Sequence, residues 1–221
     1  ASALLVNDFV AIAHAIPALQ AEELRPLGGG PADQGAPRIV MGAGTGLGVA
    51  QLLPGTPWTV IAGEGGHAEL AAHDNEQALV LAQLRRSFGR VSAETVLSGP
   101  GLEHLYGALA PTQPRGAREI AEAAWRGEPA ARRAVHLFTR WLGHYAADLA
   151  LIARAGGGIY LAGGIVPSWG QHFDAAQFRA AFDDHPRFGP WLGSVPAFVV
   201  THPQPGLLGL AVLADAVVRR S

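Results

Sequence analysis

The sequence of 221 residues contains neither cysteine nor lysine, and all of its 16 basic residues are arginine. Without cysteine the chain cannot form a disulfide, a thiolate metal site or a thiol nucleophile. Without lysine it has no P-loop lysine, no strand lysine of the protein-kinase type and no Schiff-base lysine. Charge is sparse as well, at 15% of residues, and 18 acidic residues leave a formal net charge of −2. This balance gives no electrostatic footprint for nucleic acid or for an anionic membrane.

Long hydrophobic runs are also missing. No segment approaches the roughly 18 uninterrupted apolar residues of a membrane span, and the first residues lack the basic-then-apolar pattern of a secretory signal. Hydrophobic residues still make up 49% of the chain, which is enough to bury a core. We therefore expect a folded, cytoplasmic protein that has neither a membrane nor a nucleic acid as a partner.

The order of apolar runs and glycine clusters predicts an α/β protein with more than one lobe. Asn7 or Asp8 is placed as the N-cap of a first helix, because apolar residues follow at helical spacing. Strands are expected over 38–41, 49–53 and 58–62, with glycine-rich turns between them. Beyond residue 70 we expect helices over 74–86, from 92, and over 100–109, 116–126, 129–154, 172–184 and 207–219, and strands over 159–162 and 197–201.

The first glycine cluster, GAGTGLG at 42–48, fits neither common nucleotide motif. No register gives the dinucleotide fingerprint GxGxxG, and a P-loop would need lysine. Two interpretations remain open: an ordinary glycine-rich hairpin, or a turn whose bare backbone amides form an anion-binding nest.

Other polar residues are ambiguous when each is taken alone. Glu64 and His67, in GEGGH, form either a polar turn or a site with an acceptor and a switchable donor. Asn7 and Asp8 are either a helix N-terminus or a catalytic pair, and Glu94 is by default a carboxylate in the first turn of a helix. The nine histidines show no metal-binding pair, and a zinc-deaminase interpretation of His67 fails because it requires cysteines.

Six segments, spread over essentially the whole chain, are more informative together. They are VNDF (6–9), GAGTGLG (42–48), GEGGHAEL (63–70), RVSAETVLSGPGLEHLY (90–106), LAGGIVP (161–167) and QPGLLG (204–209). In this order and spacing they resemble the bacterial glucokinase family, which belongs to the sugar kinase/hsp70/actin superfamily. A related group of repressors and kinases carries a zinc-binding cysteine cluster, so the absence of cysteine favours the glucokinase branch.

The resemblance implies a two-lobed, ribonuclease-H-like α/β fold. Residues 1–20 would form the end of the small lobe and the hinge, 21–201 the large lobe, and 202–221 a helix that returns to the small lobe. Family members begin with a strand and an Asp-x-Gly-Gly-Thr-type loop that contacts phosphate and metal, and this sequence has no such loop. The chain thus resembles a family member that starts about a third of the way in, and its last helix is expected to expose leucine and valine.

On the sugar side, the resemblance assigns Asp8 as the general base for the 6-hydroxyl of glucose. A carboxylate suits this role because phosphoryl transfer asks mainly for positioning and modest proton acceptance. The residues implied to bind sugar hydroxyls are Asn7, Asp8, Glu64, His67 and Glu94.

On the nucleotide side, the resemblance implies that Gly44, Thr45 and Gly46 hold the phosphates of ATP, while Gly163 and Gly164 lie beside its adenosine. ATP would arrive as its Mg²⁺ complex, and the sequence offers no obvious protein ligand for the metal. The expected activity is transfer of the γ-phosphoryl group of ATP to glucose by a homodimer. The alternatives are a non-catalytic glucose-binding module, an inactive kinase fragment or, with less support, a regulatory relative; ADP or polyphosphate also remain open as donors.

Overall fold

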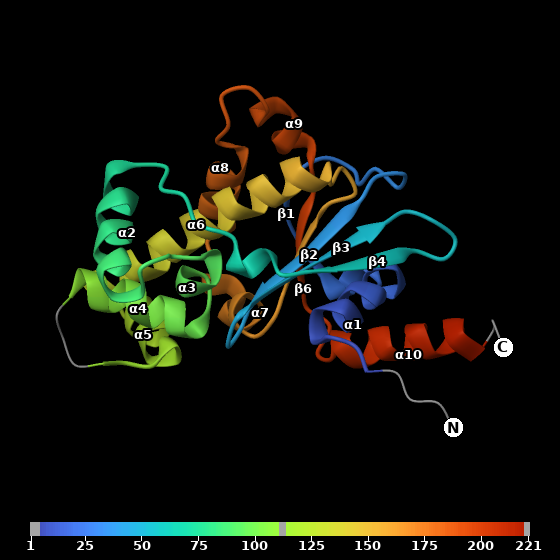
Figure 1. Ribbon diagram of the computed structural model, residues 1–221, viewed down its shortest axis with the longest axis horizontal. Helices are drawn as coiled ribbons and strands as arrows, with labels where there is room; N and C mark the ends of the chain where they lie inside the picture. The colour runs from blue at the N-terminus through green and yellow to red at the C-terminus, as the bar shows by residue number, and fades with distance from the viewer. Residues whose placement is uncertain (1–4, 111–113, 219–221) are drawn as a thin grey trace.

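A computed structural model describes residues 5–110 and 114–218, with a six-stranded sheet at its centre (Figure 1). The strands are β1 (Leu24–Gly28), β2 (Arg38–Ala43), β3 (Leu47–Leu53), β4 (Thr59–Gly63), β5 (Ile159–Ala162) and β6 (Ala197–Val200). Their order across the sheet is β1-β6-β5-β2-β3-β4. The central strands β2, β5 and β6 are parallel, whereas β3 and β4 continue the sheet antiparallel on one side and β1 pairs antiparallel with β6 on the other.

Helices cover both faces of this sheet. They are α1 (Asp8–Ala15), α2 (Asn75–Phe88), α3 (Ala93–Val96), α4 (Gly99–Leu109), α5 (Ala117–Trp125), α6 (Pro129–Ala153), α7 (Ile165–Trp169), α8 (Ala175–Asp183), α9 (Gly189–Ser194) and α10 (Pro205–Val218). Every helix and strand expected from the sequence is present. Three elements were not expected: β1, which contains Pro26 and is an edge strand, and the short helices α7 and α9. Helices of five or six residues are too short to show a periodicity.

Strand β2 shows how alternating side chains build two cores. Ile39 and Met41 face the larger core, which contains α4 and α6, whereas Val40 faces the smaller core on the opposite side. There Val40 packs with Phe9 and Ile12 of α1. All six residues of β2 are buried, as expected of a central strand covered on both faces.

The long helix α6 crosses one face of the sheet (Figure 1). Phe138 and Trp141 of this helix are fully buried. Its helical spacing predicts one shared face, formed by Leu137, Trp141, Tyr145, Leu149 and Ile152. The first four are buried, whereas Ile152 in the last turn is 83% exposed. Spacing identifies a face of a helix and not whether another element covers its last turn.

Helices α1 and α10 lie side by side on the other face (Figure 1). Their close approach depends on Gly209, where a Cβ atom would overlap the backbone oxygen of Ala11. Leu207 and Leu210 of α10 remain 62% and 41% exposed. In residues 5–110 and 114–218, no helix combines the length and the apolar character needed to cross a membrane.

Candidate functional site

The turn between β2 and β3 forms a glycine-rich loop, Gly44–Gly46, at one edge of the sheet. The Gly44 amide donates to the Gly46 carbonyl oxygen at 2.8 Å, and the Gly44 oxygen accepts from the Gly99 amide, also at 2.8 Å. Thr45 is exposed at the tip. We call residues 44–46 the glycine loop; its most exposed residue is Thr45, which carries a hydroxyl.

A second glycine turn lies beside this loop because β5 is the parallel neighbour of β2. Gly163 has a φ of +81° and approaches Ala43 so closely that a Cβ atom would lie 2.6 Å from the Ala43 oxygen. At Gly44, a Cβ atom would lie 3.9 Å from the Gly164 amide nitrogen. The fold therefore brings together all five glycine-turn residues singled out in the sequence, at the carboxyl ends of two parallel strands, where α/β sheets bind ligands.

A pocket of about 560 Å³ opens next to Gly164. It lies between α4, α5 and α7, and its polar groups are Arg118, Glu122 and Ser168. Trp125 and Trp169 form an aromatic wall, with their rings edge to face at 5.6 Å. Sequence reasoning missed this pocket: its residues are scattered over several helices, and their only signal was a pair of tryptophans without a motif.

Glu64, His67 and Glu94 come together beside the glycine loop. The Nε2 atom of His67 lies 3.8 Å from Glu64 Oε2, and its Nδ1 atom lies 3.8 Å from Glu94 Oε1. Glu64 and His67 are 84% and 62% exposed, whereas Glu94 is 35% exposed. The cluster thus offers two carboxylates and an imidazole to a solvent-accessible ligand rich in hydroxyls.

Glu94 owes its position to α3. Ser92 caps this helix, with Thr95 completing a reciprocal capping box, so Glu94 lies in the first turn as the sequence predicts. Its Oε2 atom accepts a hydrogen bond of 2.8 Å from the backbone amide of Leu47, the residue that follows the glycine loop. Glu94 is therefore more than a first-turn carboxylate, because it reaches across to another element.

The backbone around His67 is held closely against β3. At Gly66 a Cβ atom would overlap the Leu47 oxygen, so only glycine fits there. The Tyr145 hydroxyl of α6 donates to the Gly65 carbonyl oxygen. These contacts make the GEGGH turn part of the packed structure, although two of its side chains point into solvent.

Asn7 and Asp8 begin α1. The Asn7 Oδ1 atom accepts from the Phe9 amide at 2.8 Å, which confirms its interpretation as the N-cap. Asp8 is exposed in the first turn, where its Oδ1 also accepts from Phe9, at 2.9 Å. Phe9 packs against Gly48 of β3, where a Cβ atom would overlap its ring. Phe9, the neighbour of Asp8 in the chain, thus contacts β3 at the position next to Leu47, whose amide donates to Glu94.

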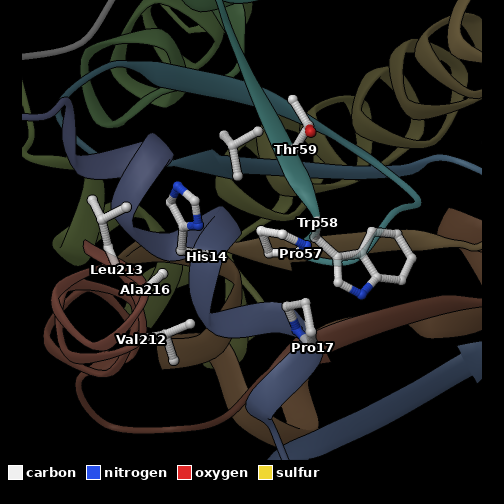
Figure 2. A pocket seen from close by; sticks show the side chains of 9 residues that line it. His14, Pro17, Pro57, Trp58, Thr59, Val212, Leu213 and Ala216 are labelled. Atoms are coloured by element: carbon white, nitrogen blue, oxygen red, sulfur yellow. The ribbon is translucent and has the colours of Figure 1, made fainter. Parts of the chain in front are cut away.

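Two further pockets lie around α1 and α10. Asp8 lines a groove of about 450 Å³ with Gln204, Leu207 and Leu210. Figure 2 shows another, of about 500 Å³, between α1, α10 and the start of β4. It contains His14 and Trp58 but none of the predicted site residues, and burial lowers the pKa of His14. In the part of the chain that the structure describes, no group of three or more histidine, aspartate or glutamate side chains is arranged to hold a metal ion.

Comparison with known proteins identifies the family. Residues 1–217 match the family model Glucokinase. A glucokinase of Yersinia pestis (strain Pestoides F) is 44% identical over 212 residues, which cover 93% of this chain and 66% of the relative. The crystal structure of a glucokinase from an Antarctic psychrotroph is 36% identical, with a TM-score of 0.88, and covers 94% of this chain and 67% of that one.

A glucokinase from Balamuthia mandrillaris in complex with glucose has a TM-score of 0.77 over 94% of this chain and 64% of that chain. At 24% identity it shows a shared fold alone. The mixed sheet with helices on both faces confirms the α/β fold expected from the sequence. The chain spans 66% of the length of the curated relative that it matches. Over that span, with a family match that includes all six motif segments, the chain belongs to the glucokinase family.

Proposed function

We propose that this chain carries the sugar and nucleotide sites of an enzyme that transfers the γ-phosphoryl group of ATP to the 6-hydroxyl of glucose. The observation that carries the proposal is the convergence at Leu47, where the glycine loop, the GEGGH turn and Glu94 meet. If the glycine loop binds phosphate and the Glu64, His67 and Glu94 cluster binds a polyhydroxylated ligand, the two would lie side by side, as phosphoryl transfer requires.

The nucleotide would lie along the carboxyl edge of the parallel strands. Gly44, Thr45 and Gly46 would hold its phosphates through the amides of Thr45 and Gly46 and the Thr45 hydroxyl, with the Gly44 amide closing the loop onto the Gly46 oxygen, which supplies a phosphate cradle without lysine. Gly163 and Gly164 would pass beside the ribose, and the pocket of about 560 Å³ next to them offers an aromatic wall for the base. Because the described residues hold no carboxylate cluster for a metal, we assign no protein ligand to Mg²⁺ and derive no step from it.

The sugar would be bound by Glu64, His67 and Glu94, together with Asn7. Carboxylates accept two hydrogen bonds each, and a hexose offers vicinal hydroxyls that donate and accept. Leaving such groups unpaired is costly, so an epimer or a deoxy sugar should be rejected. Asp8 would accept the proton of the 6-hydroxyl as that oxygen attacks the γ-phosphorus.

The domain assignment follows the same proposal. Residues 21–201 would form the large lobe, 1–20 the end of the small lobe and the hinge with Asp8, and 202–221 the helix that returns to the small lobe. The groove beside Asp8 and the exposed Leu207 and Leu210 support this, because they present an apolar surface next to the proposed base. Closure of the lobes would exclude water from the transfer. A homodimer in the cytoplasm is part of the proposal, and light scattering on the purified protein tests the dimer.

The proposal is tested with the full-length protein and with this chain. Formation of glucose 6-phosphate is measured with ATP, ADP and polyphosphate as donors, and glucose binding is measured by calorimetry. We expect turnover with ATP and glucose in the full-length protein. Glucose binding without turnover in the full-length protein would favour the non-catalytic module, and neither binding nor turnover would refute the proposal.

A substitution at Glu64 tests the sugar site directly. Glu64→Gln removes a charged acceptor and should weaken glucose binding by about tenfold. The matched control is Glu69→Gln, which alters an exposed carboxylate that instead pairs with Arg85. Equal glucose affinity in the two variants would return Glu64 to the polar-turn interpretation.

A further inference from the structure

Both polar groups of the Leu47 backbone, its amide and its carbonyl oxygen, lie in close contact with neighbouring residues. Its amide donates to Glu94 Oε2 at 2.8 Å, and its carbonyl oxygen lies where a Cβ atom of Gly66 would be. Leu47 itself is 5% exposed, so its backbone is screened from water. This residue directly follows the glycine loop, so the position of its backbone determines where the loop ends.

A second bond ties the same two segments together. The Gly99 amide, at the start of α4, donates to the Gly44 oxygen at 2.8 Å. Between Glu94 and Gly99 the chain is stiffened by Ser98, whose hydroxyl donates to the Glu94 carbonyl oxygen at 2.7 Å and accepts from the Gly101 amide at 3.0 Å. The α3–α4 segment thus holds the glycine loop at both ends, through Gly44 and through Leu47.

The two oxygens of Glu94 have different neighbours. Oε2 binds the Leu47 amide, whereas Oε1 faces His67 at 3.8 Å on the sugar side. The glycine loop leaves little room for this carboxylate to move, because a Cβ atom at Gly46 would lie 2.5 Å from Oε2. The Glu94 carboxylate therefore contacts the glycine loop through Oε2 and faces His67 of the proposed sugar site through Oε1.

We propose that Glu94 is a positioning residue for the nucleotide as well as a ligand for the sugar, and that it couples the two sites. This inference rests on the proposed function. It predicts that the nucleotide affinity depends on the Glu94–Leu47 hydrogen bond even when no sugar is present. It also predicts the reciprocal effect: a change confined to the glycine loop that displaces Glu94 weakens sugar binding.

The first test separates the two roles of Glu94 with two substitutions. Glu94→Gln keeps an oxygen that can accept from the Leu47 amide but loses the charge offered to the sugar, whereas Glu94→Ala loses both. Binding of a non-hydrolysable ATP analogue without glucose is measured by calorimetry. We expect Glu94→Ala to weaken it by about tenfold and Glu94→Gln by about twofold or less, while both variants lose glucose affinity.

Hydrogen exchange at the Leu47 amide provides a readout that requires no ligand. We expect faster exchange in Glu94→Ala than in the unmodified protein, with protection retained in Glu94→Gln. Glu69→Ala serves as the control, since its carboxylate contacts Arg85. Equal affinity for the ATP analogue in the unmodified protein, Glu94→Ala, Glu94→Gln and Glu69→Ala would overturn the inference. It would leave the proposed function standing. Failure of the unmodified full-length protein to bind sugar or nucleotide would overturn the proposed function itself.

The second test approaches the coupling from the glycine loop. Gly46→Ala places a methyl group against Glu94 Oε2, whereas at Gly107 of α4, outside both proposed sites, no atom lies within 4 Å of an added Cβ. Neither glycine has a positive φ that would strain alanine. We expect Gly46→Ala to weaken glucose binding by about tenfold and Gly107→Ala to leave glucose affinity within about twofold. The same glucose affinity in both variants would contradict the coupling.

Discussion

At the scale of single residues, the sequence left Asn7 and Asp8 as either a helix N-terminus or a catalytic pair. In the structure the two residues differ. Asn7 is the N-cap, since its side chain accepts from the Phe9 amide. Asp8 is the next residue along, exposed and lining a groove. A helix N-terminus needs one capping side chain, so the carboxylate of Asp8 is not required as the cap.

Asp8→Asn should lower kcat in the full-length enzyme by about 10²- to 10⁴-fold, because it removes the proposed proton acceptor. Glucose affinity should stay within about tenfold, as expected when a role confined to the transition state is lost. The control is Asp174→Asn, which keeps an N-cap of α8 and should leave turnover unchanged. Steady-state kinetics with calorimetry check this, and full turnover in Asp8→Asn would remove the base assignment.

Gly48→Ala should displace Phe9, since a methyl group at Gly48 would overlap the Phe9 ring. We expect a loss of about 1–3 kcal/mol in the free energy of unfolding, together with a lower kcat, because Asp8 moves with Phe9. Gly63→Ala on the neighbouring strand is the control, with the nearest atom 3.7 Å from its Cβ. Urea unfolding measures the loss of stability, and similar curves for both variants would contradict it.

At the scale of elements, the sequence predicted the helices and strands whose signal lies within one segment of the chain. The apolar run of β2 and the 25-residue α6 carry strong signals, and Asp74 and Ser92, where two of the expected helices begin, are the N-caps of α2 and α3. The edge strand β1 and the short helices α7 and α9 carry no comparable signal. Their structure is imposed by neighbours, because tertiary packing overrides weak local preference.

The packing of α1 on α10 is such a tertiary effect, and it can be tested at one position. Gly209→Ala places a methyl group on the Ala11 backbone oxygen and should separate the helices, at a cost of about 1–3 kcal/mol. Gly206→Ala, in the same helix, has its nearest neighbour 4.0 Å away. It should be neutral or stabilising by up to about 1 kcal/mol, since alanine favours a helix. Urea unfolding distinguishes the two, and equal stability would refute the crossing.

At the scale of the whole molecule, a stacked pair of histidines, the exposed His73 and the buried His144, joins the segment before α2 to α6. The rings of His73 and His144 stack at 3.7 Å. The Nε2 atom of His144 is buried, with no hydrogen-bond partner in residues 5–110 and 114–218. Burial lowers the pKa of His144 from 6.5 to about 4; His73 and Arg140 act in the same direction, against Asp184 and Asp74.

This pKa shift predicts how stability depends on pH. Because His144 has a lower pKa when folded, the unfolded chain binds the extra proton, and the free energy of unfolding falls as the pH drops from about 6.5 to 4. The loss from this group should be on the order of 2–3 kcal/mol. Urea unfolding from pH 7 to pH 4.5 measures it, with His144→Phe as the variant that lacks the proton site. An equally steep loss in His144→Phe would assign the effect to other groups.

By itself, the sequence determined the family, most of the helices and strands, and the loops that carry glycine and polar residues, because each is a local pattern of residue types. Only the tertiary structure decided which of them meet. β5 lies beside β2 although more than a hundred residues separate them in the chain, and this pairing places Gly163 against Ala43 and Gly164 near Gly44. The pocket of α4, α5 and α7, and the junction of Glu94 with Leu47, arise in the same way. Periodicity and motif record what one segment prefers, whereas proximity depends on how strands pair and helices pack across the whole chain.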